Sequence, residues 1–171
     1  MPFLTAPSEI YKNTFLQGLK EFQAEGRRME YTIQQLQENF GPFVKMLLAQ
    51  GNAATTLPGR VPESIFWLID GNDFIGRVSI RHTLTEDLTY VGGHIGYEIR
   101  PTKRQQGYGK IILQRGLEEA KFLGLKRVLL TCDTNNIASQ KIIEANGGVL
   151  EDETYVKHYH GTIRRYWIQI S

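Results

Sequence analysis

Residues 100–110, which read RPTKRQQGYGK, join a predicted strand at 94–100 to a predicted helix that begins at Gly107 and carries apolar residues at helical spacing. The first N–H groups of a helix have no partner within it, its dipole is positive at that end, and glycines let the backbone approach phosphate oxygens closely. Positive side chains gather in the same segment: Lys103, Arg104 and Lys110. The segment is therefore predicted to bind a phosphate-like anion.

Three known phosphate or nucleic-acid motifs compete for this segment, and each fails on spacing. The dinucleotide fingerprint needs a small residue where this chain has Ile112. The P-loop needs glycine where Arg104 stands and Ser or Thr where Ile111 stands. The RNA-binding RNP1 pattern needs aromatic residues on a strand, but Lys110 and Leu113 occupy those positions in a predicted helix.

The pattern that remains is Arg104-x-x-Gly107-x-Gly109, which resembles the Q/R-x-x-G-x-G/A signature of the GNAT acetyltransferase superfamily. The predicted order of elements over residues 64–170 is similar to that of the superfamily. Four further segments resemble an uncharacterised bacterial subgroup of it: 81–82, 92–97, 136–139 and 165–168. The resemblance implies an α/β fold, a GNAT-type single domain with a mixed central sheet of about six or seven strands and helices on both faces.

Hydrophobic periodicity predicts the elements around the glycine-containing segment. Helices are predicted at 8–26 and 32–50, and Gly41-Pro42 is expected to kink or split the second. The other predicted elements are a hairpin of 64–70 and 74–82, a polar loop through residues 86 and 87, a strand at 128–132, a helix from Asn135 or Asn136 to 146, and a hairpin of 149–159 and 162–170. Residues 1–60 are the expected acceptor-side helical segment, and residues 61–171 the expected acetyl-CoA-binding sheet and helices.

Length, charge and cysteine content restrict the fold and function classes that remain possible. A chain of 171 residues suits one domain, and its composition excludes disordered and collagen-like classes. Twenty Lys and Arg against 18 Asp and Glu give a net charge of +2, so no overall field indicates a nucleic-acid or membrane partner. Cys132 is the only cysteine, which excludes internal disulfides and thiolate metal clusters. We expect a cytoplasmic protein because no leader pattern opens the sequence, and a homodimer is left open.

The resemblance implies that acetyl-CoA is the cosubstrate and that no metal is required. The backbone N–H groups of residues 105–110 are expected to hold its pyrophosphate, and the preceding strand is expected to bind the pantetheine arm. An N–H near Ile99 is expected to face the thioester carbonyl and stabilise the oxyanion. The implied cofactor-binding residues are Ile99, Arg104, Gln105, Gln106, Gly107, Tyr108, Gly109, Lys110, Asn136 and Ser139.

Transfer of acetyl to an amine requires a base, and the strand at 94–100 offers two candidates. Glu98 is the first choice, directly or through a water, and His94 is the second. On an ideal strand both share one face with Arg100. Two structural alternatives stay open: Glu98 pairs with Arg81 across neighbouring strands, or His94 is a satisfied core histidine.

The residue that protonates the departing thiolate is less well defined. Many superfamily members carry a tyrosine seven residues after the Asn that begins their second helix, and here that position is Ile143. Tyr155, Tyr159 and Tyr166 of the closing hairpin, or solvent, are the alternatives. Cys132 is conceivable as an acyl carrier, but a lone cysteine in an apolar strand is more often a buried apolar residue.

The sequence predicts an amine-bearing acceptor, either a small molecule or a protein, without identifying it. The first two helices and the loop at 83–93 are the expected walls of the acceptor site. A catalytically silent CoA-binding or regulatory module is the alternative function, made credible by Ile143. A nucleic-acid-binding domain is a third hypothesis and predicts strongly salt-dependent binding.

Overall fold

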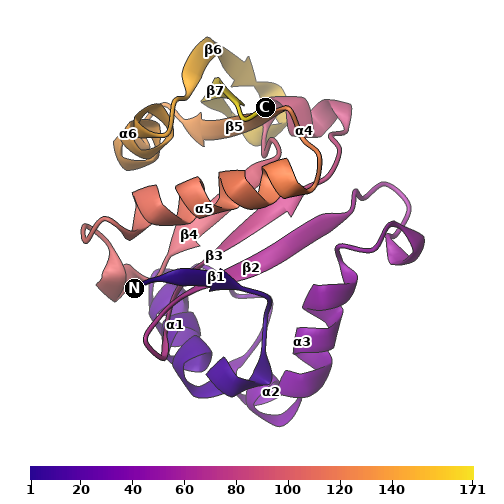
Figure 1. Cartoon of the computed structure of the whole chain (residues 1–171), viewed down its shortest axis with the longest axis vertical. Helices are drawn as coiled ribbons and strands as arrows, with labels where there is room; N and C mark the ends of the chain where they lie inside the picture. Colours follow the sequence, from indigo (N-terminus) through magenta and orange to yellow (C-terminus); the bar gives the residue numbers. More distant parts are fainter.

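Seven strands form two antiparallel sheets in the computed structural model, which describes residues 1–171 (Figure 1). The strands of the first sheet are, in order, β1 (Phe3–Thr5), β2 (Glu63–Asp70), β3 (Asp73–Arg81) and β4 (Ile95–Ile99). Those of the second are β5 (Arg127–Asp133), β7 (Gly161–Gln169) and β6 (Val149–Val156). β4 and β5 are thus edge strands of different sheets, and they contact each other.

Helices cover both faces of the first sheet (Figure 1). One face carries α1 (Lys12–Ala24), α2 (Ile33–Glu38) and α3 (Phe40–Ala49), and the other carries α5 (Tyr108–Phe122). α6 (Ile137–Ala145) packs against α5 and β5, and the short α4 (Glu86–Tyr90) follows β3. Single 3-10 turns occupy Glu9–Tyr11, Ala53–Thr55, Pro101–Lys103 and Lys157–Tyr159. None of the helices is both long enough and apolar enough to span a bilayer.

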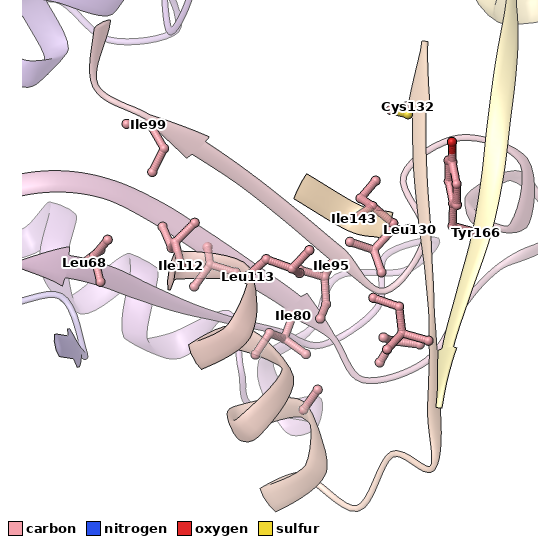
Figure 2. Close-up of a cluster of buried hydrophobic side chains, with 14 of the residues drawn as sticks. Leu68, Ile80, Ile95, Ile99, Ile112, Leu113, Leu130, Cys132, Ile143 and Tyr166 are labelled. Atoms are coloured by element: carbon pink, nitrogen blue, oxygen red, sulfur yellow. The ribbon is translucent and has the colours of Figure 1, made fainter. Parts of the chain in front are cut away.

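Two hydrophobic cores lie on opposite faces of β2 and β3. Trp67 and Phe74 point toward α1 and α3 and pack there with Phe15 and Phe43. Leu68 points the other way, into a core shared with α5 and the second sheet (Figure 2). Because the central strands are buried on both faces, β2 reads as a nearly continuous apolar run instead of an alternating one.

The two sheets meet at one end of β4. The N–H of His94 donates to the carbonyl of Leu129 at 2.8 Å, and the N–H of Leu129 donates to Nδ1 of His94 at 2.9 Å. Beyond this junction β4 and β5 diverge, so that Ile99 and Cys132 stand well apart in Figure 2. A side chain at Gly93, which has φ of +60°, would collide with the carbonyl of Leu129, so glycine is required for this close approach.

The seven strands and the helices on both faces confirm the predicted fold class, with corrections in detail. The expected single sheet is two sheets, because β4 and β5 separate after their junction. The predicted helix 32–50 divides at Asn39 and not at Gly41-Pro42: Pro42 lies in the first turn of α3, where its missing N–H has no helical acceptor to lose. The polar loop after β3 contains α4, and β1 was not predicted.

Candidate functional site

The segment before α5 presents a row of free backbone donors. The N–H groups of the six consecutive residues Gln105 to Lys110 make no hydrogen bond within the protein, and the first helical bond is donated by the N–H of Ile111. The chain turns sharply within this row, because Gln105 and Gly107 have φ of +60° and +86°. A glycine-containing turn with several free donors at a helix start has the chemistry to hold a phosphate.

Two contacts fix the position of this turn. Gly109 packs against α6, where an added Cβ would lie 2.5 Å from Cδ1 of Ile142. Arg104 points away from the turn: its Nε donates to the carbonyl of Ile99 at 3.1 Å, and its guanidinium pairs with both carboxylate oxygens of Glu25 at 2.8 and 2.9 Å. Arg104 therefore ties β4 and α1 to the turn.

The predicted cluster of positive charge is only partly available to a ligand. Lys103 pairs with Asp73 at 3.0 Å, and Arg104 with Glu25. Lys110 is exposed and has no acidic partner. Of the three cations, only Lys110 is therefore free to meet an anion. Tyr108 also has its hydroxyl engaged, by Asp70 at 2.8 Å, so its contribution to the row of donors is its N–H.

The backbone groups on the outer edge of β4 bond to no other strand, and one of them, the carbonyl of Ile99, accepts from Nε of Arg104 instead. The N–H of Arg100 donates to Ile75, and the N–H of Arg81 donates to the carbonyl of His94. Because bonding alternates along an antiparallel pair, the backbone groups of Ile95, Tyr97 and Ile99 point away from β3, toward the gap between the sheets. Figure 2 shows this gap widening from Ile95 to Ile99.

Polar side chains bridge β4 to α6 beside this gap. The hydroxyls of Tyr97 and Ser139 are 3.0 Å apart. Asn136 caps α6 by accepting the N–H of Ser139 at 3.1 Å. Burial raises the pKa of Tyr97 to about 12 and that of Cys132 to about 11, so both stay protonated at neutral pH. Cys132 is 8% exposed and belongs to the core, as the structural alternative for it expected.

A cavity of about 500 Å³ lies on the opposite face of the first sheet. Aromatic and aliphatic side chains of α1, α2, α3 and β2 form much of its lining, Trp67 among them. Glu98 and Gly96 of β4 face it. The first helices, expected as walls of the acceptor site, line this cavity. The loop at 83–93 contributes no lining residue, whereas Arg60 and Glu63, beyond α3, do so.

Glu98 lies in this cavity within a group of arginines. Nη2 of Arg27 donates to its Oε2 at 2.9 Å, Nη2 of Arg28 contacts its Oε1, and Nη1 of Arg77 lies 3.8 Å from Oε1. Glu98 is opposite Arg77 in the β3–β4 register. The proposed pairing of Glu98 with Arg81 is therefore wrong: Arg81, four residues further along β3, contacts Glu63 and the carbonyls of 92 and 93.

Arg27 and Arg28 reach Glu98 from the turn after α1. Arg28 has φ of +55°, a left-handed conformation that is uncommon outside glycine. The side-chain amide of Gln23 holds this turn by donating to the carbonyls of Arg28 at 3.1 Å and Tyr31 at 2.6 Å. The turn thus brings two guanidinium groups over the carboxylate of β4.

His94 is not placed beside Glu98 in the cavity. It is 9% exposed, does not line the cavity, and its Nδ1 is occupied by the N–H of Leu129 at 2.9 Å. Burial, with smaller effects from Arg127 and Arg81, lowers its pKa. This geometry favours the alternative of a satisfied core histidine that joins the two sheets.

Acidification is expected to destabilise the protein through His94. The unfolded histidine titrates near pH 6.5 and the folded one below it, so between these values the unfolded chain binds more protons, and stability falls as pH falls. His94→Asn keeps an acceptor for the N–H of Leu129 but does not titrate. The unfolding temperature of this variant, measured between pH 7.5 and 5, should depend less on pH than that of the wild type. An equal dependence on pH in both proteins would contradict this role of His94.

The position expected for a tyrosine acid offers no acid. Ile143 is 1% exposed and packs in the core shared by α5 and the second sheet. Tyr159 bonds Asp133 at 2.7 Å, Tyr166 bonds Glu144 at 3.1 Å, and Tyr155 is 63% exposed. Tyr97, which sequence reasoning missed, is the tyrosine that borders the gap, and its place two residues before Ile99 was the available signal.

The comparisons with known proteins agree with this architecture. A family model described as an acetyltransferase (GNAT) domain matches residues 18–149. RimL, a ribosomal-protein α-N-acetyltransferase solved with coenzyme A, has 19% identity, a TM-score of 0.69, and coverage of 99% of this chain and 94% of that one. The microcin self-immunity acetyltransferase MccE, solved with acetyl-CoA and AMP, has 14% identity, a TM-score of 0.72, and coverage of 99% and 92%.

Mutant forms of the spermidine/spermine N-acetyltransferase SpeG from Vibrio cholerae are also similar, at 15% identity, a TM-score of 0.62, and coverage of 99% and 95%. No curated protein sequence matches the chain significantly. At these identities the solved structures show a shared fold, and their acceptors differ from one another.

Proposed function

The chain belongs to the acetyltransferase (GNAT) family, and on that premise we propose that it transfers acetyl from acetyl-CoA directly to an amine in a ternary complex. The observation that carries this proposal is the row of six unbonded N–H groups from Gln105 to Lys110. A pyrophosphate offers acceptor oxygens and negative charge to that row, to the positive end of the α5 dipole, and to Lys110. Gln105, Gln106, Gly107, Tyr108 and Gly109 would act through their backbones.

The diverging edges of β4 and β5 suit the pantetheine arm. The arm contains two amides, and an extended chain that enters beside an open strand edge can bond to its free backbone groups. Tyr97 points its N–H and carbonyl toward this gap, and Ile99 points its unbonded N–H there, while its carbonyl accepts from Arg104. The N–H of Ile99 would then face the thioester carbonyl and stabilise the oxyanion. Asn136 and Ser139, at the start of α6, would border the arm.

The proposed reaction converts a protonated amine and acetyl-CoA into an acetylated amine, coenzyme A and one proton. The ammonium group first loses a proton to Glu98, directly or through a water. The nitrogen lone pair then forms a bond to the carbonyl carbon, and the C–S bond breaks as the oxyanion collapses. The sulfur leaves as a thiolate and takes up a proton, while the product nitrogen releases its second one. Glu98 is preferred to His94 because it faces the cavity.

The Tyr97–Ser139 pair would supply the hydrogen bond or proton that the departing sulfur needs. Tyr97→Phe removes this hydroxyl and is expected to lower kcat about tenfold, equivalent to about 1.4 kcal/mol, because solvent can substitute in part. Tyr155→Phe is the matched control, since Tyr155 is 63% exposed and its hydroxyl has no partner. Steady-state rates of both variants test this; equal rates for the wild type and Tyr97→Phe would contradict it.

The decisive experiment combines binding and turnover. Calorimetry with acetyl-CoA measures binding, and release of free thiol in the presence of a panel of amines, with mass spectrometry of the products, measures transfer. We expect acetyl-CoA to bind and at least one class of amine to be acetylated. Tight binding of CoA without turnover on any amine would instead support a catalytically silent CoA-binding module.

A further inference from the structure

We propose that the acceptor is an amine that also carries an anionic group, a carboxylate or a phosphate, together with an aromatic or large apolar group. This inference rests on the proposed acetyltransferase function and names the chemistry of its second substrate. It is carried by the charge and the unused donors of the cavity beside Glu98.

The cavity has an excess of positive charge. Five arginines and three glutamates line it, with no lysine or aspartate, so two positive charges are left over. A polyamine would meet this excess with charges of the same sign, and its ammonium groups would find only three carboxylates, all of them already paired with arginine. An acceptor with its own negative charge offsets the excess while bringing its amine to Glu98.

Arg77 and Arg60 have donors that nothing in the protein uses. Arg77 projects from the middle of β3 with 21% of its side chain exposed, donates no hydrogen bond, and approaches Glu98 no closer than 3.8 Å. Burial lowers the pKa of Arg77 to about 10, so it is charged at neutral pH. Arg60 lines the cavity from the segment before β2 and has no acidic partner. A guanidinium without hydrogen bonds, partly buried in Arg77 and exposed in Arg60, fits a carboxylate or phosphate.

The same anion would alter the surroundings of Glu98. Both of its carboxylate oxygens are held by guanidinium groups, Oε2 by Arg27 and Oε1 by Arg28. Each carboxylate oxygen has two lone pairs, so one lone pair of each Glu98 oxygen stays available beside its guanidinium. An anionic acceptor attracts the same guanidiniums, weakens their hold on Glu98 and so makes this carboxylate a better proton acceptor for the amine. The acceptor charge thus serves both binding and proton removal.

The apolar part of the acceptor follows from the rest of the lining. Twelve of the 23 lining residues are hydrophobic, among them Phe15, Phe22 and Trp67. The indole Nε1 of Trp67 is the one buried side-chain polar atom without a hydrogen-bond partner in the protein. An aromatic amino acid, which joins an amine, a carboxylate and a ring, has all three parts that this cavity matches.

Matched acceptors test the inference. The rate constant kcat/KM is measured for phenylalanine against phenylalaninamide, in which a neutral amide replaces the carboxylate, and for 2-aminoethyl phosphate against ethanolamine. We expect each anionic amine to exceed its neutral partner at least tenfold, and the larger ratio identifies carboxylate or phosphate as the source of the charge. Spermidine should be the poorest acceptor. Ratios near one, or a preference for spermidine, would overturn the inference and leave the acetyltransferase function intact.

Arginine variants test whether Arg77 binds the anionic group of the acceptor. Arg77→Gln should lower kcat/KM for phenylalanine at least five times more than for phenylalaninamide, whereas equal losses for both would count against the inference. Arg115→Gln is the control, because Arg115 lies on the exposed surface of α5 and pairs there with Glu118.

A binding measurement keeps the inference testable if no amine is acetylated. The chain has two tryptophans, and Trp167→Phe leaves Trp67 as the only indole reporter. Quenching of Trp67 by phenylalanine at lower concentration than by phenylalaninamide supports an anionic ligand even when the proposed activity fails. Equal quenching curves would overturn it.

Discussion

Replacing Gly107 with valine is expected to weaken acetyl-CoA binding by about 10- to 100-fold. A hydrogen bond to a charged group contributes roughly 1.5–3 kcal/mol, so disturbing the row of N–H donors at one position has an effect of this size. Gly107 has φ of +86°, which valine adopts only with strain, and nothing lies within 4 Å of its Cβ position, so the strain falls on the backbone that carries the donors. Calorimetric titration with acetyl-CoA measures the change.

The same helix provides a matched control at its other end. Gly124 has φ of +89° and equally open surroundings. Gly124→Val should therefore lower the unfolding temperature by about as much as Gly107→Val while leaving acetyl-CoA affinity at the wild-type value. If the two variants bind acetyl-CoA equally well, the pyrophosphate does not lie at the start of α5.

Glu98→Gln is expected to lower kcat by about 10²- to 10⁴-fold with little change in acetyl-CoA affinity. Removal of a general base typically has this magnitude, and the cavity that holds Glu98 lies on the face of the sheet opposite α5. The amide keeps the shape of the carboxylate and can still accept from Arg27. Rates across a range of pH, with calorimetry for acetyl-CoA, measure both effects, and the acidic limb of the rate profile should disappear.

Two controls separate this effect from loss of folding. Glu118→Gln removes a carboxylate that pairs with Arg115 on the exposed surface and should leave kcat unchanged. The unfolding temperature of Glu98→Gln shows whether three arginines tolerate the loss of their shared partner. A folded Glu98→Gln variant with the wild-type pH–rate profile would remove Glu98 as the base.

Local patterns predicted the elements well because each pattern is complete within a short segment. The turn at 104–109 carries its glycines, its positive residues and its helix start together, so the row of free N–H donors at this place could be predicted from the sequence. The separation of the two sheets was not, because it depends on Leu129, 35 residues from His94, bonding to both its backbone and its ring.

The surroundings of Glu98 were the least predictable part of the candidate site. The side chain of Glu98 faces the cavity because side chains alternate along a strand, which is a local property. The partners of Glu98 depend on distant parts of the chain. Arg77 is placed by the β3–β4 register, and Arg27 and Arg28 belong to a turn about 70 residues earlier. That turn depends on the left-handed backbone conformation of Arg28, whose carbonyl accepts from Gln23. The neighbouring sequence does not indicate such a conformation.

The junction at His94 helps to determine which side chains of β4 face the cavity. Its side chains alternate: Gly96 and Glu98 face the cavity, while Ile95 and Ile99 pack into the other core. A slip of one residue would exchange the two sets, moving the carboxylate into an apolar core and an isoleucine among the arginines. His94 bonds Leu129 at two atoms, and at position 93 only glycine fits beside the carbonyl of Leu129. His94, the second candidate for the base, thus fixes the position of the strand that carries Glu98.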